Sequence, residues 1–208
     1  MAVWPWLALV GLGAFHGINP AMGWLFAVAL GMQRHSRRVV LLSLVPLTLG
    51  HALAVGGTAA AVLAIGVPFD MQLVRYVTGS LLLAWAAFHG LYGAHHPVRV
   101  GMTVGMLGLA VWAFLMALAH GAGLMIVPAL LPLTEHAAHG HAHMAASSVP
   151  VAVAAVAVHT AAMMVVTGAV ALVVYQWVGV GFLRRGWFNL DRLWTLALIG
   201  IGAWLILG

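Results

Sequence analysis

The sequence predicts an all-α membrane protein with six transmembrane helices, folded as a single domain over residues 1–208. Hydrophobic residues make up 64% of the chain and charged residues only 5%, at a mean hydropathy of +1.11, whereas soluble domains are close to half apolar. Apolar runs long enough to cross a bilayer recur along the chain. We place these runs at about 5–31, 39–66, 72–93, 101–131, 149–177 and 190–207.

The distribution of arginine between the loops also supports this fold class. Loops 33–38, 95–99 and 181–186 contain six of the eight arginines, whereas loops 66–70 and 133–150 contain none. The positive-inside rule assigns the arginine-rich loops to the cytoplasm. This orientation predicts a multi-pass protein of the bacterial inner membrane with both termini on the periplasmic side. The high pI reflects loop arginines and does not indicate nucleic-acid binding.

Similar polar residues interrupt the two halves of the chain, about 1–98 and 99–208. The first span contains His16-Gly17 followed by Pro20, and the fourth contains His120-Gly121 followed by Pro128. An interior proline removes a helix hydrogen bond, so we expect both helices to be broken, with the His16 and Leu124 carbonyls released. Three spans per half give the halves opposite orientations. The sequence therefore predicts a 3+3 inverted repeat, which is common among transporters.

Four histidines fall deep inside predicted spans, where a polar side chain is costly and usually functional. They are His16, His51, His120 and His159. Imidazole is a common ligand of Zn, Ni, Co and Cu, so the four predict a cation site at the bilayer midplane. Asn19 adds an amide oxygen beside Pro20, and Thr48 shares a helix face with His51. The competing interpretation is that each histidine only bonds a neighbouring helix.

The predicted outer loop contains a second histidine-rich feature. Four histidines and one carboxylate fall within ten residues: Glu135, His136, His139, His141 and His143. Such a tract binds borderline divalent metals weakly, so it is a candidate auxiliary loop for metal capture. The alternative is a low-complexity loop without a function.

Other classes of function are less compatible with the sequence. With no cysteine, there is no thiolate ligand or nucleophile, and no catalytic triad, His-Glu-x-x-His motif or phosphate-binding loop is recognisable, so we expect no enzyme. A haem b held by two histidines remains an alternative for electron transfer. Export of amino acids or other small solutes is another. The expected partners are the lipid bilayer and a metal ion, without nucleic acid, and a homo-oligomer is left open.

The chain resembles the superfamily of small six-span exporters that includes the lysine exporter, cadmium resistance and nickel/cobalt (NicO-type) families. The similarity lies in length, in the three-plus-three arrangement and in the motifs His16–Pro20 and His120-Gly121 with Val127-Pro128. A histidine-rich loop is also similar to that of nickel/cobalt exporters. The His-x-x-x-x-Asp-His motif of nickel/cobalt permeases is absent. The resemblance implies membrane transport rather than a particular ion. From the four histidines we expect a membrane transporter of a transition-metal cation, in which the broken helices rock around the site and proton antiport is coupled through the same imidazoles.

Overall fold

The computed structural model describes residues 3–66, 71–92, 105–138, 144–178 and 190–207, and every regular element in these ranges is a helix. The all-α prediction is therefore confirmed for the described part of the chain. Helices lie at each of the six predicted spans. In the first half these are α1 (Trp4–Ile18), η1 (Pro20–Met22), α2 (Trp24–Gln33), α3 (Arg37–Gly66) and α4 (Met71–Tyr92). In the second half they are α5 (Met106–Ala119), α6 (Ala122–Met125), α7 (Val127–Ala138), α8 (Met144–Val173), the π-helix η3 (Val174–Val178) and α10 (Leu190–Leu207).

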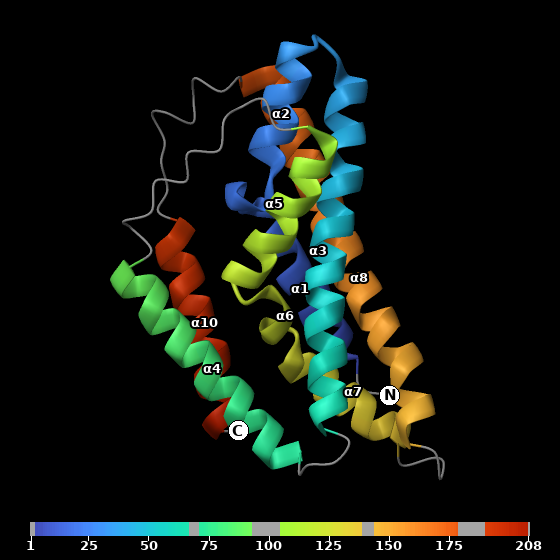
Figure 1. Cartoon of the computed structure of the whole chain (residues 1–208), viewed down its shortest axis with the longest axis vertical. Coiled ribbons are helices and arrows are strands. Elements are labelled where there is room, and N and C mark those ends of the chain that lie inside the picture. The colour runs from blue at the N-terminus through green and yellow to red at the C-terminus, as the bar shows by residue number, and fades with distance from the viewer. Residues whose placement is uncertain (1–2, 67–70, 93–104, 139–143, 179–189, 208) are drawn as a thin grey trace.

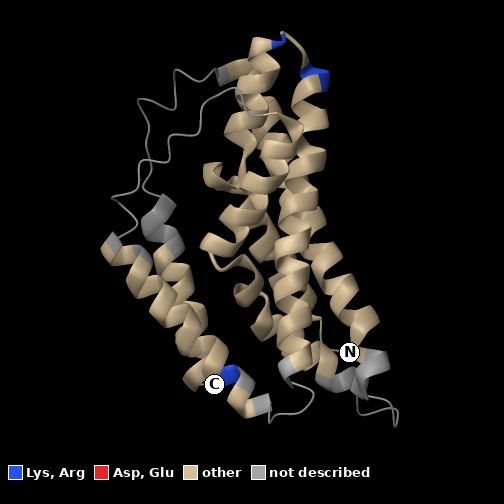
Figure 2. Ribbon diagram, in the orientation of Figure 1, with Lys and Arg blue, Asp and Glu red and all other residues tan. Residues whose placement is uncertain are grey.

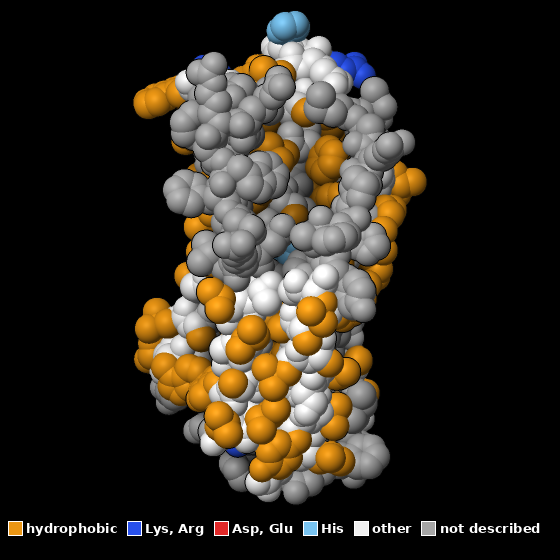
Figure 3. All heavy atoms as spheres, turned by 90° about the vertical axis from the view of Figure 1, so that its left-hand side faces the viewer, with side chains coloured by type: hydrophobic (Ala, Val, Ile, Leu, Met, Phe, Trp, Pro, Cys, Tyr) orange, Lys and Arg blue, Asp and Glu red, His pale blue; other side chains and the backbone are white. Residues whose placement is uncertain are grey.

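Among the described residues, two helices are long and apolar enough to cross a membrane by length and composition: Arg37–Ala64 and Ser148–Trp177. The first and fourth predicted spans are divided into shorter helices, so neither contains one continuous helix of that length. Large apolar side chains also point away from the bundle, as Leu53, Leu107 and Val165 do on three different helices. Figure 3 shows hydrophobic side chains spread over the face that α4 and α10 present. These features are compatible with a lipid environment.

The helices associate in three side-by-side pairs, α1 with α8, α3 with α5, and α4 with α10 (Figure 1). Glycine permits close backbone approach within each pair. A Cβ at Gly17 of α1 would lie 2.6 Å from the Met163 carbonyl oxygen of α8. Gly79 and Gly202 face each other between α4 and α10, and a Cβ on either would lie within 3.0 Å of the other's carbonyl oxygen. The α4–α10 pair lies to one side of the main bundle, and both chain termini lie at the same end of the molecule.

The first span breaks where its proline predicts. Helix α1 ends at Ile18, Asn19 adopts an extended conformation, and Pro20 begins the short 3₁₀ helix η1. The Asn19 side chain caps η1 by accepting a hydrogen bond of 2.9 Å from the Ala21 backbone N–H. Gly23, with φ of +108°, then reverses the backbone into α2, a conformation that other residues rarely adopt. Proline, asparagine and glycine each supply one part of this break.

The fourth span also breaks, but Pro128 is not the cause that we predicted. Helix α5 ends at Ala119, and Gly121 adopts a left-handed conformation with φ of +67°. Pro128 is the second residue of α7, a position where the missing N–H costs no helix hydrogen bond. The break therefore lies at His120-Gly121 and depends on glycine, and Pro128 helps to start the helix that follows.

Candidate functional site

Three of the four predicted histidines pack against one another at the centre of the main bundle. The ring centroids of His16 and His51 are 5.7 Å apart, those of His16 and His159 are 5.0 Å apart, and those of His51 and His159 are 5.5 Å apart. Each ring comes from a different helix, α1, α3 or α8, and none is more than 1% exposed. We call His16, His51 and His159 the histidine cluster.

The cluster separates two apolar cores along the bundle axis. One core contains Leu9, Ala54 and Ala155, and the other contains Leu47 and Ala171, among further residues. On both α3 and α8 the cluster histidine falls between residues of the two cores. The imidazoles therefore occupy the middle of the bundle, in the low-dielectric position where an unpaired polar group is most costly.

Backbone carbonyls hold two of the cluster rings in a defined tautomer. Nδ1–H of His16 donates to the Leu12 carbonyl at 2.7 Å, and Nδ1–H of His159 donates across to the Leu9 carbonyl of α1 at 3.3 Å. In a neutral imidazole the proton on Nδ1 leaves the lone pair on Nε2. A carbonyl bonded to one nitrogen is also the usual outer partner of a metal-binding histidine.

His51 differs from its two neighbours, because both of its ring nitrogens are buried without a protein hydrogen-bond partner. Nε2 of His159 is in the same state. A buried polar atom without a partner costs about 1–3 kcal/mol, and such atoms are uncommon in native proteins. These nitrogens therefore need a ligand or a water molecule, and a purely structural role leaves their burial unexplained.

The ring spacing is compatible with one shared metal ion. Two imidazoles bound to the same ion at ~2.1 Å per nitrogen have ring centroids about 5 Å apart in tetrahedral geometry. Within the described residues, however, no group of three or more His, Cys, Asp or Glu side chains forms a ready-made metal site. The His51 and His159 rings are nearly parallel, at 16°, so their nitrogens do not converge as packed. Ring rotation is required before three nitrogens can face one ion.

His120 interacts electrostatically with His16, but it lies outside the three mutually packed rings, at the second break, between α5 and α6. It is 2% exposed, and its Nδ1–H donates to the Met116 carbonyl at 2.8 Å, again leaving the lone pair on Nε2. The four-histidine arrangement predicted from the sequence thus becomes three mutually packed rings, with the fourth histidine on the other broken helix.

The carbonyls of the first break are not released, contrary to expectation. The His16 carbonyl accepts from the Asn19 backbone N–H at 3.1 Å, and the Gly17 carbonyl accepts from the Thr167 hydroxyl of α8 at 3.3 Å. Two further carbonyls of this break accept hydrogen bonds from indole N–H groups. Trp24 donates to the Ile18 carbonyl at 3.0 Å, and Trp112 of α5 donates to the Ala21 carbonyl at 2.9 Å. Because protein donors occupy these oxygens, they are poor candidates for binding a cation.

The second break is satisfied in a similar way. The Trp85 indole N–H of α4 donates to the Ala119 carbonyl, and the Leu124 carbonyl, which we expected to be free, accepts from the Ile126 N–H. The role of Trp24, Trp85 and Trp112 was not predicted from the sequence. A tryptophan inside a predicted span, rather than at its ends, is the signal that points to such an indole donor.

The other predicted site residues have structural roles. The Asn19 side-chain oxygen caps η1, while its amide nitrogen is buried without a hydrogen-bond partner. The Thr48 hydroxyl bonds the Leu44 carbonyl at 2.7 Å and lies 3.0 Å from the Met164 sulfur, at the contact with α8. Pro20 starts η1, and Pro128 lines a cavity near Arg75. None of these observations makes them ligands.

The predicted metal-capture loop falls outside the described residues. His139, His141 and His143 lie within 139–143, and the side chains of Glu135 and His136 at the end of α7 are likewise not described. Its role remains a prediction from the sequence.

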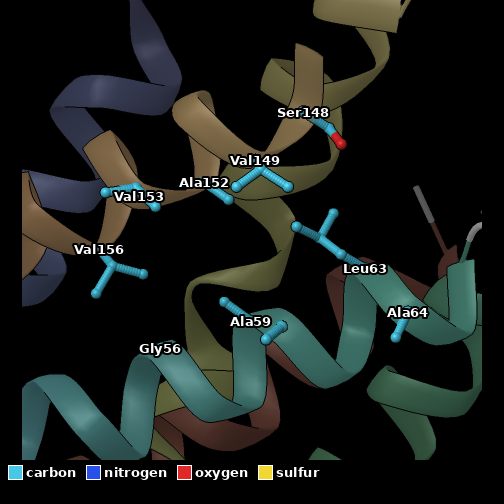
Figure 4. A pocket seen from close by; sticks show the side chains of 10 residues that line it. Gly56, Ala59, Leu63, Ala64, Ser148, Val149, Ala152, Val153 and Val156 are labelled. Atoms are coloured by element: carbon cyan, nitrogen blue, oxygen red, sulfur yellow. The ribbon is translucent and has the colours of Figure 1, made fainter. Parts of the chain in front are cut away.

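A cleft between α3 and α8 approaches the cluster from the end where α3 ends and α8 begins. Its volume is about 410 Å³, and Figure 4 shows Gly56, Ala59 and Val156 among its lining residues. Val156 is three residues from His159, and Gly56 is five residues from His51. The walls are almost entirely apolar, so the cleft suits hydrocarbon better than a hydrated ion.

The described charges lie far from the cluster. In the ribbon of Figure 2, the described basic residues lie at the two ends of the molecule, and no described residue is coloured as acidic. The three acids of the chain, Asp70, Glu135 and Asp191, all have side chains outside the described set. The site that the structure describes is therefore a set of imidazoles without a charged side chain of another type beside it among the described residues.

Comparison of the chain with protein-family models, with curated proteins and with solved structures finds no match in any of the three.

Proposed function

We propose that this protein is a membrane transporter of a transition-metal cation and that the histidine cluster is its central binding site. The observation that carries the proposal is the set of three buried imidazoles from three helices, spaced as ligands of one ion, with nitrogens of His51 and His159 that lack protein partners. Imidazole with a bound outer carbonyl is the ligand type that Zn, Ni, Co and Cu share. We propose His120 as a further contact on the pathway.

The helix pairing supports six membrane spans arranged as an inverted repeat. An inverted repeat exchanges spans one and four, two and five, and three and six. Helix α1 belongs to span one and α8 to span five. The exchange turns a contact of spans one and five into a contact of spans four and two. That second contact is also present, as the packing of α5 against α3. The α4–α10 pair converts into itself, and Gly79 and Gly202 face each other across it. All three observed pairs obey this symmetry.

The ends of the bundle support the orientation that the arginines predict. Arg34, Arg37 and Arg38 lie at the turn between α2 and α3, and both termini lie at the opposite end of the molecule (Figures 1 and 2). We propose that the arginine end is cytoplasmic and that the termini are periplasmic.

The proposed mechanism uses imidazole alone. A hydrated ion that reaches the cluster would exchange its water ligands for Nε2 of His16 and His159 and one nitrogen of His51, after rotation of the stacked rings. Acid opposes binding, because a protonated imidazole has no lone pair for the metal. Protons and metal ions therefore compete for the same nitrogens, which allows exchange of one for the other. Movement of the two broken helices opens the site to alternate sides.

The geometry favours a bare metal ion over haem. Two axial imidazoles of a haem stand on opposite faces of the porphyrin, which requires a slot between them. Here the ring centroids of His51 and His159 are only 5.5 Å apart, and the His16 ring packs against both. A haem protein shows a Soret band, whereas a metal-ion transporter is free of it. Amino-acid export leaves the histidines as packing residues and predicts transport that survives their removal.

Transport in proteoliposomes tests the proposal. Purified wild type is compared with His51→Ala and His159→Ala for metal content and for uptake of Zn²⁺, Ni²⁺, Co²⁺ and Cu⁺. The matched control is His35→Asn, which removes an exposed imidazole at the far turn and suits the positive φ of that residue, +47°. We expect both cluster variants to lose uptake and the control to retain it. Equal uptake in all four proteins contradicts the site.

A further inference from the structure

A second cavity, which shares no lining residue with the α3–α8 cleft, contains a cationic side chain. Its volume is about 220 Å³, and it is lined by Trp4, Arg75, Pro128, Leu131, Pro132, Trp204 and Leu205. Four elements contribute to it: α1, α4, α7 and α10. The cavity therefore lies where the α4–α10 pair meets the main bundle.

Arg75 stands apart from the other described arginines. Arg34, Arg37 and Arg38 lie at the α2–α3 turn, whereas Arg75 lies near the start of α4, at the end of the molecule that carries the termini. It is half-buried, and no ion pair or hydrogen bond joins it to another described residue. A guanidinium held in a cavity needs an anionic partner to offset its lost hydration.

The depth of the cavity matches that of lipid headgroups. Arg75 lies about one helical turn, ~5 Å, from the start of α4. Trp4 opens α1 and Trp204 lies in the last turn of α10, and their rings pack edge to face with centroids 5.8 Å apart. Tryptophan is typical of the membrane–water interface, where the indole meets headgroups and acyl chains together. Both tryptophans are about half exposed, so the cavity opens toward the surroundings.

We propose that this cavity binds the phosphodiester group of a membrane phospholipid, with the Arg75 guanidinium as its hydrogen-bond donor. Guanidinium forms paired hydrogen bonds with phosphate oxygens, and the Trp4 and Trp204 rings pack along the glycerol and upper acyl chain. The cavity holds the volume of about seven waters at ~30 Å³ each, which is enough for a phosphodiester. The lipid then joins the α4–α10 pair to the main bundle. This inference depends on the chain lying in a bilayer and is independent of metal transport.

Thermal unfolding of the delipidated full-length protein in detergent tests the site. Four additives are compared: phosphatidylglycerol, phosphatidylcholine, diacylglycerol with the same acyl chains, and inorganic phosphate. We expect both phospholipids to raise the unfolding midpoint in a saturable way, by about 3 °C, and the other two additives to have no such effect. In Arg75→Gln the apparent lipid affinity falls about tenfold or more, because a charge-assisted pair is lost. In Arg75→Lys, which keeps the charge but not the paired geometry, the loss is smaller.

The control is Arg38→Gln, an exposed arginine at the other end of the molecule, and it retains wild-type lipid affinity. If Arg75→Gln unfolds during purification, the Arg75→Lys and Trp204→Ala variants replace it, and both must weaken lipid binding. Equal protection by diacylglycerol, or undiminished affinity in the Arg75 variants, overturns the proposal. Equal protection by inorganic phosphate also overturns it, since the cavity then takes a soluble anion. His51→Ala leaves the lipid effect intact, so failure here is distinct from failure of the metal site.

Discussion

Each of the two broken helices carries a His-Gly pair followed by a proline, yet the two breaks are built differently. At the first break, Asn19 caps the 3₁₀ turn that Pro20 starts, and His16 lies in the last turn of α1 before it. At the second, Gly121 alone provides the unusual backbone conformation, and His120 is the residue that follows the last residue of α5. His16 points into the cluster from a regular helix, whereas His120 lies in the break itself.

In the inverted repeat that we propose, this difference places an asymmetric site in a symmetric scaffold. The helix pairing follows the proposed twofold exchange, but the three-ring cluster contains both members of the His51–His159 pair and only one of the His16–His120 pair. A transporter must bind its ion more favourably in one step than in the next. In the transport cycle that we propose, His120, which has no counterpart inside the three-ring cluster, allows ion binding and ion release to differ in affinity.

The largest expected effect separates His16 from His120. We predict that His16→Ala lowers metal affinity by more than ~100-fold, because removing an outer partner of a ligand already costs 10–100-fold and a ligand contributes more. His120→Ala is predicted to lower equilibrium affinity less than ~10-fold while slowing transport. Calorimetric titration of the purified variants measures the metal affinity, and proteoliposome uptake measures the transport rate.

Equal losses of affinity in His16→Ala and His120→Ala contradict the asymmetry and restore the four-histidine site. A double variant, His16→Ala with His120→Ala, provides the control. If the two residues act independently, its loss equals the sum of the single losses in free energy.

The sequence predicts the helices well because their patterns are local. Within the described residues, helix lies in each of the predicted apolar runs, and Pro20 with its neighbours predicts the first break. The second break was assigned to Pro128, eight residues too late, because a proline near the start of a helix resembles an interior proline when helix ends are unknown. Gly121 carried the better signal, since a left-handed turn requires glycine.

The site was less predictable because it depends on distances between helices. Sequence spacing places four histidines at similar depth, but only packing decides which rings meet. Gly13 is a decisive residue in this respect, because a Cβ there would overlap the His159 carbonyl and hold α8 away from His16. The hydrogen-bond partners of the carbonyls at the breaks are equally unpredictable from sequence. Their donors come from helices distant in the chain: Thr167, Trp85 and Trp112.

Substitution of glycine at the two breaks provides the second test. We predict that Gly17→Ala destabilises the protein by about 1–3 kcal/mol through overpacking, since the added Cβ would lie 2.6 Å from the Met163 carbonyl oxygen. At Gly121 the nearest atom to an added Cβ is 3.4 Å away, so the cost of Gly121→Ala is the left-handed conformation, about 1–2 kcal/mol. Chemical denaturation in detergent measures both.

Asparagine distinguishes the two causes, because it tolerates the left-handed conformation but adds bulk. We expect Gly121→Asn to be milder than Gly121→Ala and Gly17→Asn to be more severe than Gly17→Ala. Gly11→Ala is the control, since nothing lies within 4 Å of its added Cβ. The reverse order at either position contradicts the assigned cause.

The indole hydrogen bonds give a smaller effect at each break. We predict that Trp112→Phe and Trp85→Phe each cost about 1–2 kcal/mol, because they leave the Ala21 and Ala119 carbonyls buried without a donor. Trp177→Phe, at a side chain that is 85% exposed, is the control and is expected to be neutral. Unfolding midpoints of the three variants test this, and an equal loss in Trp177→Phe shows that aromatic bulk, not the hydrogen bond, is being measured.

The smallest expected effect concerns Asn19, whose side chain has a counterpart neither in sequence nor in structure at the second break. Its oxygen caps η1, so Asn19→Ala is predicted to cost about 1 kcal/mol of stability, whereas Asn19→Ser, which keeps an acceptor, costs a few tenths. Because the cap already uses that oxygen, neither variant should change the metal affinity more than about twofold beyond its effect on folding. A large loss of affinity in Asn19→Ala with stability intact shows instead that the amide binds the ion. In that case the first break contributes a side chain to the metal site, whereas the second break contributes only a change of helix direction, and the two breaks differ more than their histidines alone indicate.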